Sequence, residues 1–155
     1  IELNDSVTQR LRQDGFQAFS SPLEELDDLP KNTFQLITLF SVLEHVASPR
    51  DLMIKAYEIL APGGLLVFEV PNAKSTNAKL FKDRYWGGYH TPRHWNLFSA
   101  ETIESVALSL GYTFIMRKRT PGHAFWPWSL HHFFRYAMGW DKFGKLFNGF
   151  SHWTH

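Results

Sequence analysis

The sequence predicts an α/β domain built on a mostly parallel sheet with helices on both faces. Residues 34–40 form an almost continuous apolar run, which is typical of a strand buried on both faces of such a sheet. Residues 50–60 carry apolar side chains at helical spacing, and residues 65–70 form a second apolar run. A strand, a helix and a strand in this order predict a βαβ unit.

The helix of this unit has clear signals at both ends. Ser48 suits the N-cap, Pro49 suits the first helical position, and Asp51 places an acid three residues after the cap. Pro62-Gly63-Gly64 is expected to end the helix before the second strand. The predicted buried face of the helix consists of Leu52, Met53, Ala56, Ile59 and Leu60.

The N-terminal region predicts a helix between two short strands. Residues 1–3 resemble the end of a strand, and Asn4 is placed to cap a helix that runs to about Gln13. Gly15 would close this helix, and residues 16–19 predict a short strand.

A long segment follows the βαβ unit. Residues 73–98 mix charged and aromatic side chains, and loops of this length inside a domain are usually lids or binding segments. Ser99 then caps a predicted helix that ends at Gly111, and residues 112–119 predict a strand. The apolar face of that helix is Ile103, Val106, Ala107 and Leu110.

The pattern changes after Pro121, so we expect a domain core over residues 1–120 and an aromatic-rich extension over residues 121–155. A helix is predicted from about Ser129 to Met138. In one interpretation, the aromatic side chains of the extension pack over the sheet or over a region upstream of this chain. In the other, the Trp-rich basic stretch sits at a membrane interface or grips a lipid-linked acceptor.

Composition excludes several classes of function. The net charge of +1 over 155 residues gives no reason to expect nucleic acid as a partner. The absence of cysteine excludes disulfides and thiolate metal sites, and is compatible with a cytoplasmic location.

His90 and His94 have an i, i+4 spacing, but nearby proline and glycine argue against a helix and no third ligand is obvious. We therefore expect no metal site.

The stretch FQLITLFSVLEHVASPRDLMIKAYEILAPGGLLVFEVPN, residues 34–72, resembles the fourth strand, following helix and fifth strand of class I S-adenosylmethionine-dependent methyltransferases. The branch it resembles most includes ubiquinone-type and polysaccharide-cluster methyltransferases, and the resemblance covers roughly residues 1–118. It implies a Rossmann-like fold and S-adenosylmethionine as cofactor. In that family a first strand and a glycine-rich turn precede the position of Ile1, so we expect both to be missing from this chain.

The resemblance also implies a set of cofactor-binding residues. Glu2 stands where the family has an acid that accepts hydrogen bonds from both ribose hydroxyls. It could equally be an exposed terminal glutamate, and the adenine-side loop could be a simple surface turn. His45 has a rival interpretation as a packed residue that holds its loop. The implied adenine-side residues are Ser21, Pro22 and Leu23, and those near the methionine portion are Phe40, Ser41 and His45.

The stretch YWGGYHTPRHWNLFSAETI, residues 85–103, resembles the acceptor side of the polysaccharide-cluster branch. His90 or His94 would serve as a general base that takes a proton from an acceptor hydroxyl. The alternative is that both histidines only hold the loop in shape. The other implied acceptor-binding residues are Tyr85, Trp86, Arg93 and Trp95.

The predicted function is methyl transfer to a small-molecule acceptor, a hydroxyl on a sugar or a quinone-like ring. The sulfonium supplies its own leaving group, so the protein mainly has to align the two reactants and exclude water. Two alternatives stay open. One is a non-catalytic or truncated Rossmann-like binding module, and the other is a nicotinamide-dependent oxidoreductase, whose sheet also uses an acid after its second strand.

Overall fold

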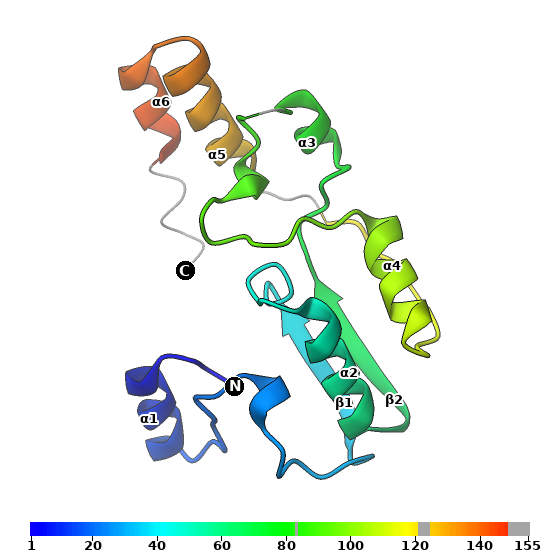
Figure 1. The fold of residues 1–155 in the computed structure, drawn as a ribbon. Coiled ribbons are helices and arrows are strands. Elements are labelled where there is room, and N and C mark those ends of the chain that lie inside the picture. Colours follow the sequence, from blue (N-terminus) through cyan, green and yellow to red (C-terminus); the bar gives the residue numbers. More distant parts are fainter. Residues whose placement is uncertain (83, 121–124, 149–155) are drawn as a thin grey trace. The chain divides into compact units, whose positions relative to one another are not determined.

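The computed structural model describes residues 1–82, 84–120 and 125–148 (Figure 1). Its contacts divide the chain into two compact units. The first comprises Ile1–Leu39 and Ser48–Val67, and the second comprises Phe40–Ala47 and the described residues from Phe68 onward. Each unit is described by itself below.

The predicted βαβ unit is confirmed. Strand β1 (Phe34–Phe40) is followed by helix α2 (Pro49–Ile59) and strand β2 (Leu60–Glu69), and the two strands pair in parallel (Figure 1). The Ser48 hydroxyl caps α2 by accepting a hydrogen bond from the Asp51 N–H at 3.3 Å. The buried face of α2 is Leu52, Met53, Ala56 and Ile59, as the helical spacing predicts.

Two details of this unit differ from the prediction. Pro62-Gly63-Gly64 lies inside β2 and does not end α2, because the chain leaves the helix at Leu60. A Cβ on Gly64 would meet the carbonyl oxygens of Ala61 and Phe34 at 2.9 Å, so glycine allows the two strands to approach.

The prediction that β1 is buried on both faces is also wrong. Leu36 is 56% exposed and Phe40 is 58% exposed, while Leu39 is buried. The described residues form a sheet of only two strands, so these apolar side chains have few neighbours to cover them.

The N-terminal helix is confirmed as α1 (Asp5–Gln13), and the Asn4 side chain caps it by accepting from the N–H groups of Ser6 and Val7. The flanking strands at 1–3 and 16–19 do not form. One backbone bond, from the Glu2 N–H to the Phe19 oxygen at 2.9 Å, joins the two segments. A single bond is not a ladder, and the described residues provide no neighbouring strand to extend it.

In the second unit, the segment after β2 contains short helices where the sequence predicted an irregular loop. These are α3 (Thr76–Leu80) and η2 (Gly87–Tyr89). A parallel bridge joins Asn72 to Phe98, so the two ends of the segment lie side by side. Residues 73–97 therefore leave this bridge and return to it, and we call this segment the excursion.

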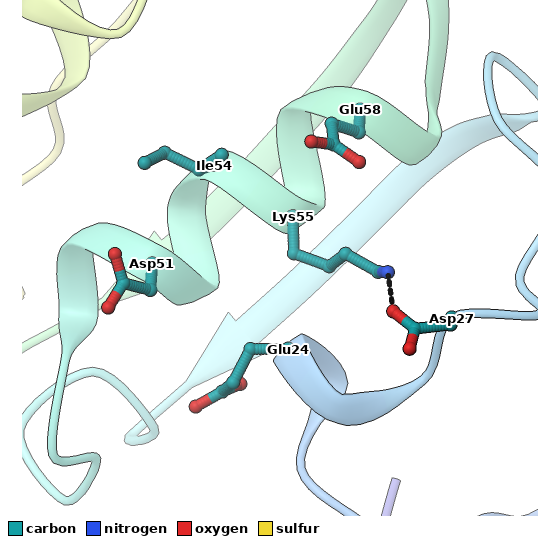
Figure 2. Close-up of a pocket in the computed structure, with 6 residues that line it drawn as sticks. All are labelled: Glu24, Asp27, Asp51, Ile54, Lys55 and Glu58. Carbon is teal, nitrogen blue, oxygen red and sulfur yellow. Dashed lines mark ion pairs between the residues drawn. The ribbon is translucent and has the colours of Figure 1, made fainter.

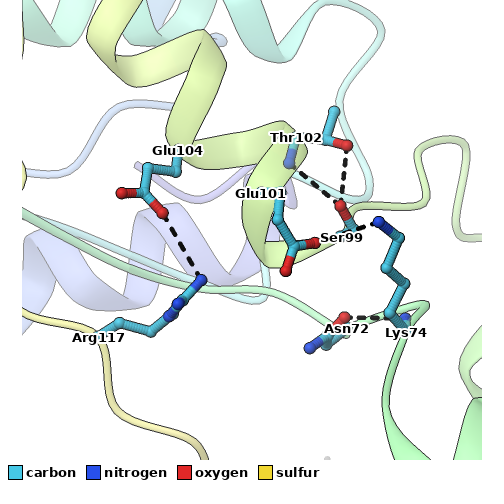
Figure 3. A network of polar contacts seen from close by, with 7 residues as sticks. All are labelled: Asn72, Lys74, Ser99, Glu101, Thr102, Glu104 and Arg117. Carbon is cyan, nitrogen blue, oxygen red and sulfur yellow. Dashed lines mark hydrogen bonds and ion pairs between the residues drawn. The ribbon is translucent and has the colours of Figure 1, made fainter.

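Helix α4 (Ala100–Ser109) follows as predicted, with Ser99 as its cap. The Ser99 hydroxyl accepts from the Thr102 N–H at 3.1 Å, and Lys74 pairs with Glu101 at 3.4 Å (Figure 3). The ion pair thus joins the first turn of α4 to the segment that follows β2.

The strand predicted over residues 112–119 does not form. Ile115 and Met116 are 76% and 78% exposed, and Arg117 pairs with Glu104 of α4 at 3.6 Å (Figure 3). A strand needs a partner for its backbone groups, and no described strand pairs with this segment.

The described part of the aromatic-rich extension, residues 125–148, contains three consecutive helical elements. They are α5 (Phe125–His132), the π-helical segment η3 (Phe133–Ala137) and α6 (Asp141–Asn148). The predicted helix thus begins four residues earlier than expected. Among the described residues, no helix combines the length and apolar character needed to cross a bilayer.

The aromatic side chains of α5 and η3 pack on the excursion between β2 and α4. The ring of Phe81 lies 5.9 Å from Trp126 and 6.2 Å from Phe133, and Trp86 lies 6.1 Å from Phe125. The buried Ser129 hydroxyl accepts from the Gly87 N–H at 2.8 Å. The excursion and the first part of the extension therefore share one core.

Candidate functional site

The loop after β1 begins with a sharp change of direction. Ser41 has a φ of +52°, in the left-handed region that non-glycine residues rarely adopt. Its N–H donates to the Glu69 oxygen at 3.2 Å, at the end of β2. Phe40 and Ser41 are both exposed here, at the carboxyl end of a parallel strand, where ligands of open α/β sheets bind.

This loop is bonded directly to the segment that carries the predicted acceptor residues. The Glu44 oxygen accepts from the N–H groups of Trp95 and Asn96 at 2.8 and 3.2 Å. The Asn96 side-chain amide donates to the oxygens of Val46 and Leu43 at 2.7 and 3.4 Å. Residues 43–46 and 95–96 are therefore held as one piece.

Three histidines meet where these two segments join. The ring centroid of His94 lies 4.8 Å from that of His45 and 4.9 Å from that of His90, each pair in an edge-to-face arrangement. His45 Nδ1 bonds to the Arg93 oxygen at 2.9 Å, and His94 Nδ1 bonds to the Gly88 oxygen at 2.7 Å. The structure thus brings both predicted base candidates together with His45.

Burial lowers the pKa of His94 from its ordinary value, and the hydrogen bond to Gly88 offsets part of this effect. Burial thus favours the neutral form of the His94 imidazole. His90 has a left-handed backbone, with φ +38°, and its ring lies 5.6 Å from that of Trp128 on α5.

Glu44 is the residue of this site that the sequence did not single out. It is 1% exposed, and its Oε2 atom has no hydrogen-bond partner among the described residues. Burial raises the pKa of its carboxyl group. The available signal was an acid beside a histidine inside the otherwise apolar stretch Val42–Val46.

The remaining predicted acceptor residues occupy different environments. Trp95 is 67% exposed, with its indole N–H donating to the Pro92 oxygen at 3.0 Å, and Arg93 is exposed as well. Tyr85 is half-buried against Phe133. Trp86 is 2% exposed and belongs to the core shared with α5, so its ring offers no face to an acceptor in this structure.

The other predicted cofactor residues lie in the first unit. The Glu2 carboxylate accepts from the Asn4 N–H at 2.9 Å, which helps to position the start of α1. Ser21 is half-buried, Pro22 precedes the short helix η1 (Leu23–Glu25), and Leu23 is buried. A cofactor role for these residues stays a prediction.

The first unit also contains an acidic hollow of ≈ 280 Å³ between α2 and η1 (Figure 2). Lys55 is its only cationic lining residue, and it pairs with Asp27 at 3.6 Å. The predicted site residues are not among those that line it. The lining consists of Glu24, Asp27, Asp51, Ile54, Lys55 and Glu58.

Comparison with known families decides the classification. A family model described as a methyltransferase domain matches residues 1–116. This chain belongs to the methyltransferase domain family. The family resemblance of the sequence is thereby confirmed at this level.

The structure of this methyltransferase domain resembles a crystal structure from Thermotoga maritima, described as a SAM-dependent methyltransferase and possible histamine N-methyltransferase. The TM-score is 0.60 at 18% sequence identity, and the match covers 73% of this chain. It covers 54% of the length of that protein. Identity this low indicates a shared fold, which confirms the predicted Rossmann-like α/β class. No curated protein matches the chain at a significant level.

Proposed function

We propose that this methyltransferase domain transfers a methyl group from S-adenosylmethionine to a hydroxyl on a sugar or a quinone-like ring. The observation that carries the proposal is the hydrogen-bonded junction of residues 43–46 with residues 95–96 in a chain of this family. This junction places His45, His90 and His94 together next to the carboxyl end of β1. The structurally similar Thermotoga protein is described as SAM-dependent, which supports the choice of cofactor.

The family resemblance implies the contacts that the cofactor would make. Phe40, Ser41 and His45 would border its methionine portion and its sulfonium, next to which an aromatic face is favourable. In the first unit, Glu2 would accept hydrogen bonds from both ribose hydroxyls, and Ser21, Pro22 and Leu23 would lie beside the adenine ring.

The proposed reaction requires one general base, which takes the proton of the hydroxyl. The bound cofactor would supply the methyl group to the acceptor oxygen, and its sulfur would keep the electron pair of the broken carbon–sulfur bond as a thioether. The hydroxyl proton passes to an imidazole. His94 suits this step because its Nδ1 bonds to the Gly88 oxygen, which leaves Nε2 as the basic atom, and because burial favours the neutral ring. His90 is the second candidate.

The acceptor would lie against the exposed residues of the same segment. The exposed ring of Trp95 would stack on a sugar or quinone-like ring, and Arg93 would bind its polar groups. The choice of acceptor rests on the likeness of residues 85–103 to the polysaccharide-cluster branch.

The test is a methyl-transfer assay with labelled S-adenosylmethionine and a panel of sugar, quinol and amine acceptors. We expect labelled ethers from the hydroxyl compounds. Replacing the true base by His90→Gln or His94→Gln should lower turnover by roughly 10²–10⁴-fold without loss of S-adenosylhomocysteine affinity. His132→Gln, at the end of α5 and outside the histidine cluster, is the control variant.

Full activity of both histidine variants would refute the general-base assignment. Methylation of amines alone would replace the hydroxyl acceptor by an amine, the acceptor class in the description of the Thermotoga protein.

A further inference from the structure

The junction described above also gathers three groups that metal ions favour. Glu44, His45 and His94 each offer one potential ligand atom, and these atoms lie within 4.8 Å of one another. They come from two segments about fifty residues apart, which are joined through the Glu44 oxygen and the Asn96 amide. The cluster therefore does not depend on one flexible loop.

One carboxylate oxygen of the glutamate in this cluster lacks a hydrogen-bond partner among the described residues. Glu44 is 1% exposed, and its buried Oε2 atom has no hydrogen-bond partner among the described residues. A buried carboxylate oxygen without a partner is costly, so such atoms usually face a cation or a donor. A bound cation next to Oε2 would remove this cost.

Both histidines present the nitrogen that a metal needs. Nδ1 of His45 bonds to the Arg93 oxygen and Nδ1 of His94 bonds to the Gly88 oxygen, so each Nδ1 carries the proton. The lone pair of each ring is therefore on Nε2. A backbone carbonyl on the other ring nitrogen is the usual support of a metal-binding histidine.

We propose that Glu44, His45 and His94 bind one divalent transition-metal ion. This departs from the expectation of no metal site, which considered His90 and His94 and found no third ligand in the sequence. Two imidazoles and a carboxylate favour a borderline ion such as Zn²⁺ over Mg²⁺ or Ca²⁺, which prefer oxygen ligands. Zinc bonds of about 2.0–2.2 Å in tetrahedral geometry place two donor atoms about 3.3–3.6 Å apart, so donors as far as 4.8 Å apart have to approach one another by up to about 1.5 Å on binding.

The ion would act on the acceptor, a role that rests on the proposed function. Three protein ligands leave a coordination position open, and a hydroxyl bound there loses its proton more readily. His94 would then be a ligand, which leaves His90, with its ring 4.9 Å from that of His94, to take the proton.

The experiment is a calorimetric titration of the chelator-treated protein with ZnCl₂, repeated with MgCl₂. We expect one saturable zinc site and much weaker binding of magnesium. Glu44→Gln, His45→Gln and His94→Gln should each lower zinc affinity by more than about tenfold, because even outer-shell partners of metal ligands change affinity by roughly 10–100-fold. His90→Gln is the matched control and should keep the affinity.

The chain has 8 histidines, so zinc binding alone is not decisive. No saturable site, or equal affinity in the wild type and in the folded ligand variants, would overturn the proposal. His45 is exposed, so its variant remains informative if Glu44→Gln does not fold. The titration requires neither S-adenosylmethionine nor an acceptor, so its result is independent of the proposed reaction.

Discussion

At the scale of single residues, the candidate site depends on side chains that bond to backbone groups far away in sequence. Asn96 is the clearest case, because its amide reaches the Val46 and Leu43 oxygens while its own N–H donates to Glu44. The sequence singled out the histidines because their residue type suits proton transfer, and that role stays a prediction. Their meeting with Glu44 was not, because contacts such as His45 to Arg93 span 48 positions and depend on tertiary structure.

Asn96→Ala should therefore destabilise the protein by about 1–3 kcal/mol, because the loop carbonyls lose their donor. Thermal or urea unfolding measures this free energy. Gln17→Ala, at an exposed position in the first unit, is the control and should change stability little. Equal stability of Asn96→Ala and the wild type would contradict the bonded junction.

A second residue-scale prediction concerns Glu101 in the first turn of α4. Its own backbone N–H, the Ser99 hydroxyl and Lys74 lower the pKa of this carboxyl to about 2. Because the pKa is lower in the folded protein, the ionised carboxylate stabilises the fold at pH values above the ordinary glutamate pKa. This contribution is lost as the pH falls through the folded-state pKa of about 2. NMR titration of the side-chain carboxyl carbon should show this midpoint, and Lys74→Gln should raise it. A midpoint in the ordinary glutamate range would contradict the network in Figure 3.

At the scale of elements, helices were predicted more accurately than strands. Asn4, Ser48 and Ser99 marked the starts of α1, α2 and α4, because a cap acts on the first turn next to it. The apolar runs at 16–19 and 112–119 look like strands but form none, because a strand depends on a partner elsewhere in the chain. The short helices α3 and η2 carried no clear periodic signal.

The contact between η2 and α5 gives an element-scale prediction. A Cβ on Gly87 would lie 2.5 Å from Trp128 Cβ and 2.9 Å from the Phe125 oxygen. Gly87→Ala should push the two elements apart and destabilise the protein by about 1–3 kcal/mol, the usual cost of overpacking. Ser129→Ala removes the hydroxyl that accepts from the Gly87 N–H, but it adds no volume. It therefore separates the loss of this hydrogen bond from the effect of overpacking.

Unfolding free energies and near-UV circular dichroism report both changes, since several aromatic rings lie at this contact. If Gly87→Ala keeps both the stability and the near-UV spectrum of the wild type, then α5 does not pack on η2 as described.

At the scale of the whole molecule, the chain combines a βαβ unit with a second unit that carries the candidate site. The family match over residues 1–116 and the shared fold agree with what the βαβ pattern and residues 34–72 predicted. For the acceptor, the sequence predicted only a class, a hydroxyl on a sugar or a quinone-like ring, because the choice within that class depends on the shape of a surface that forms after folding.

The most direct test of this account is calorimetric titration of the folded protein with S-adenosylhomocysteine, with folding verified by circular dichroism. We expect saturable binding with one site per chain. Glu2→Ala should weaken it by roughly 1–3 kcal/mol, the value of hydrogen bonds to a charged group. A folded protein that binds no S-adenosylhomocysteine would contradict the proposed cofactor site, and unchanged affinity in Glu2→Ala would remove Glu2 from it.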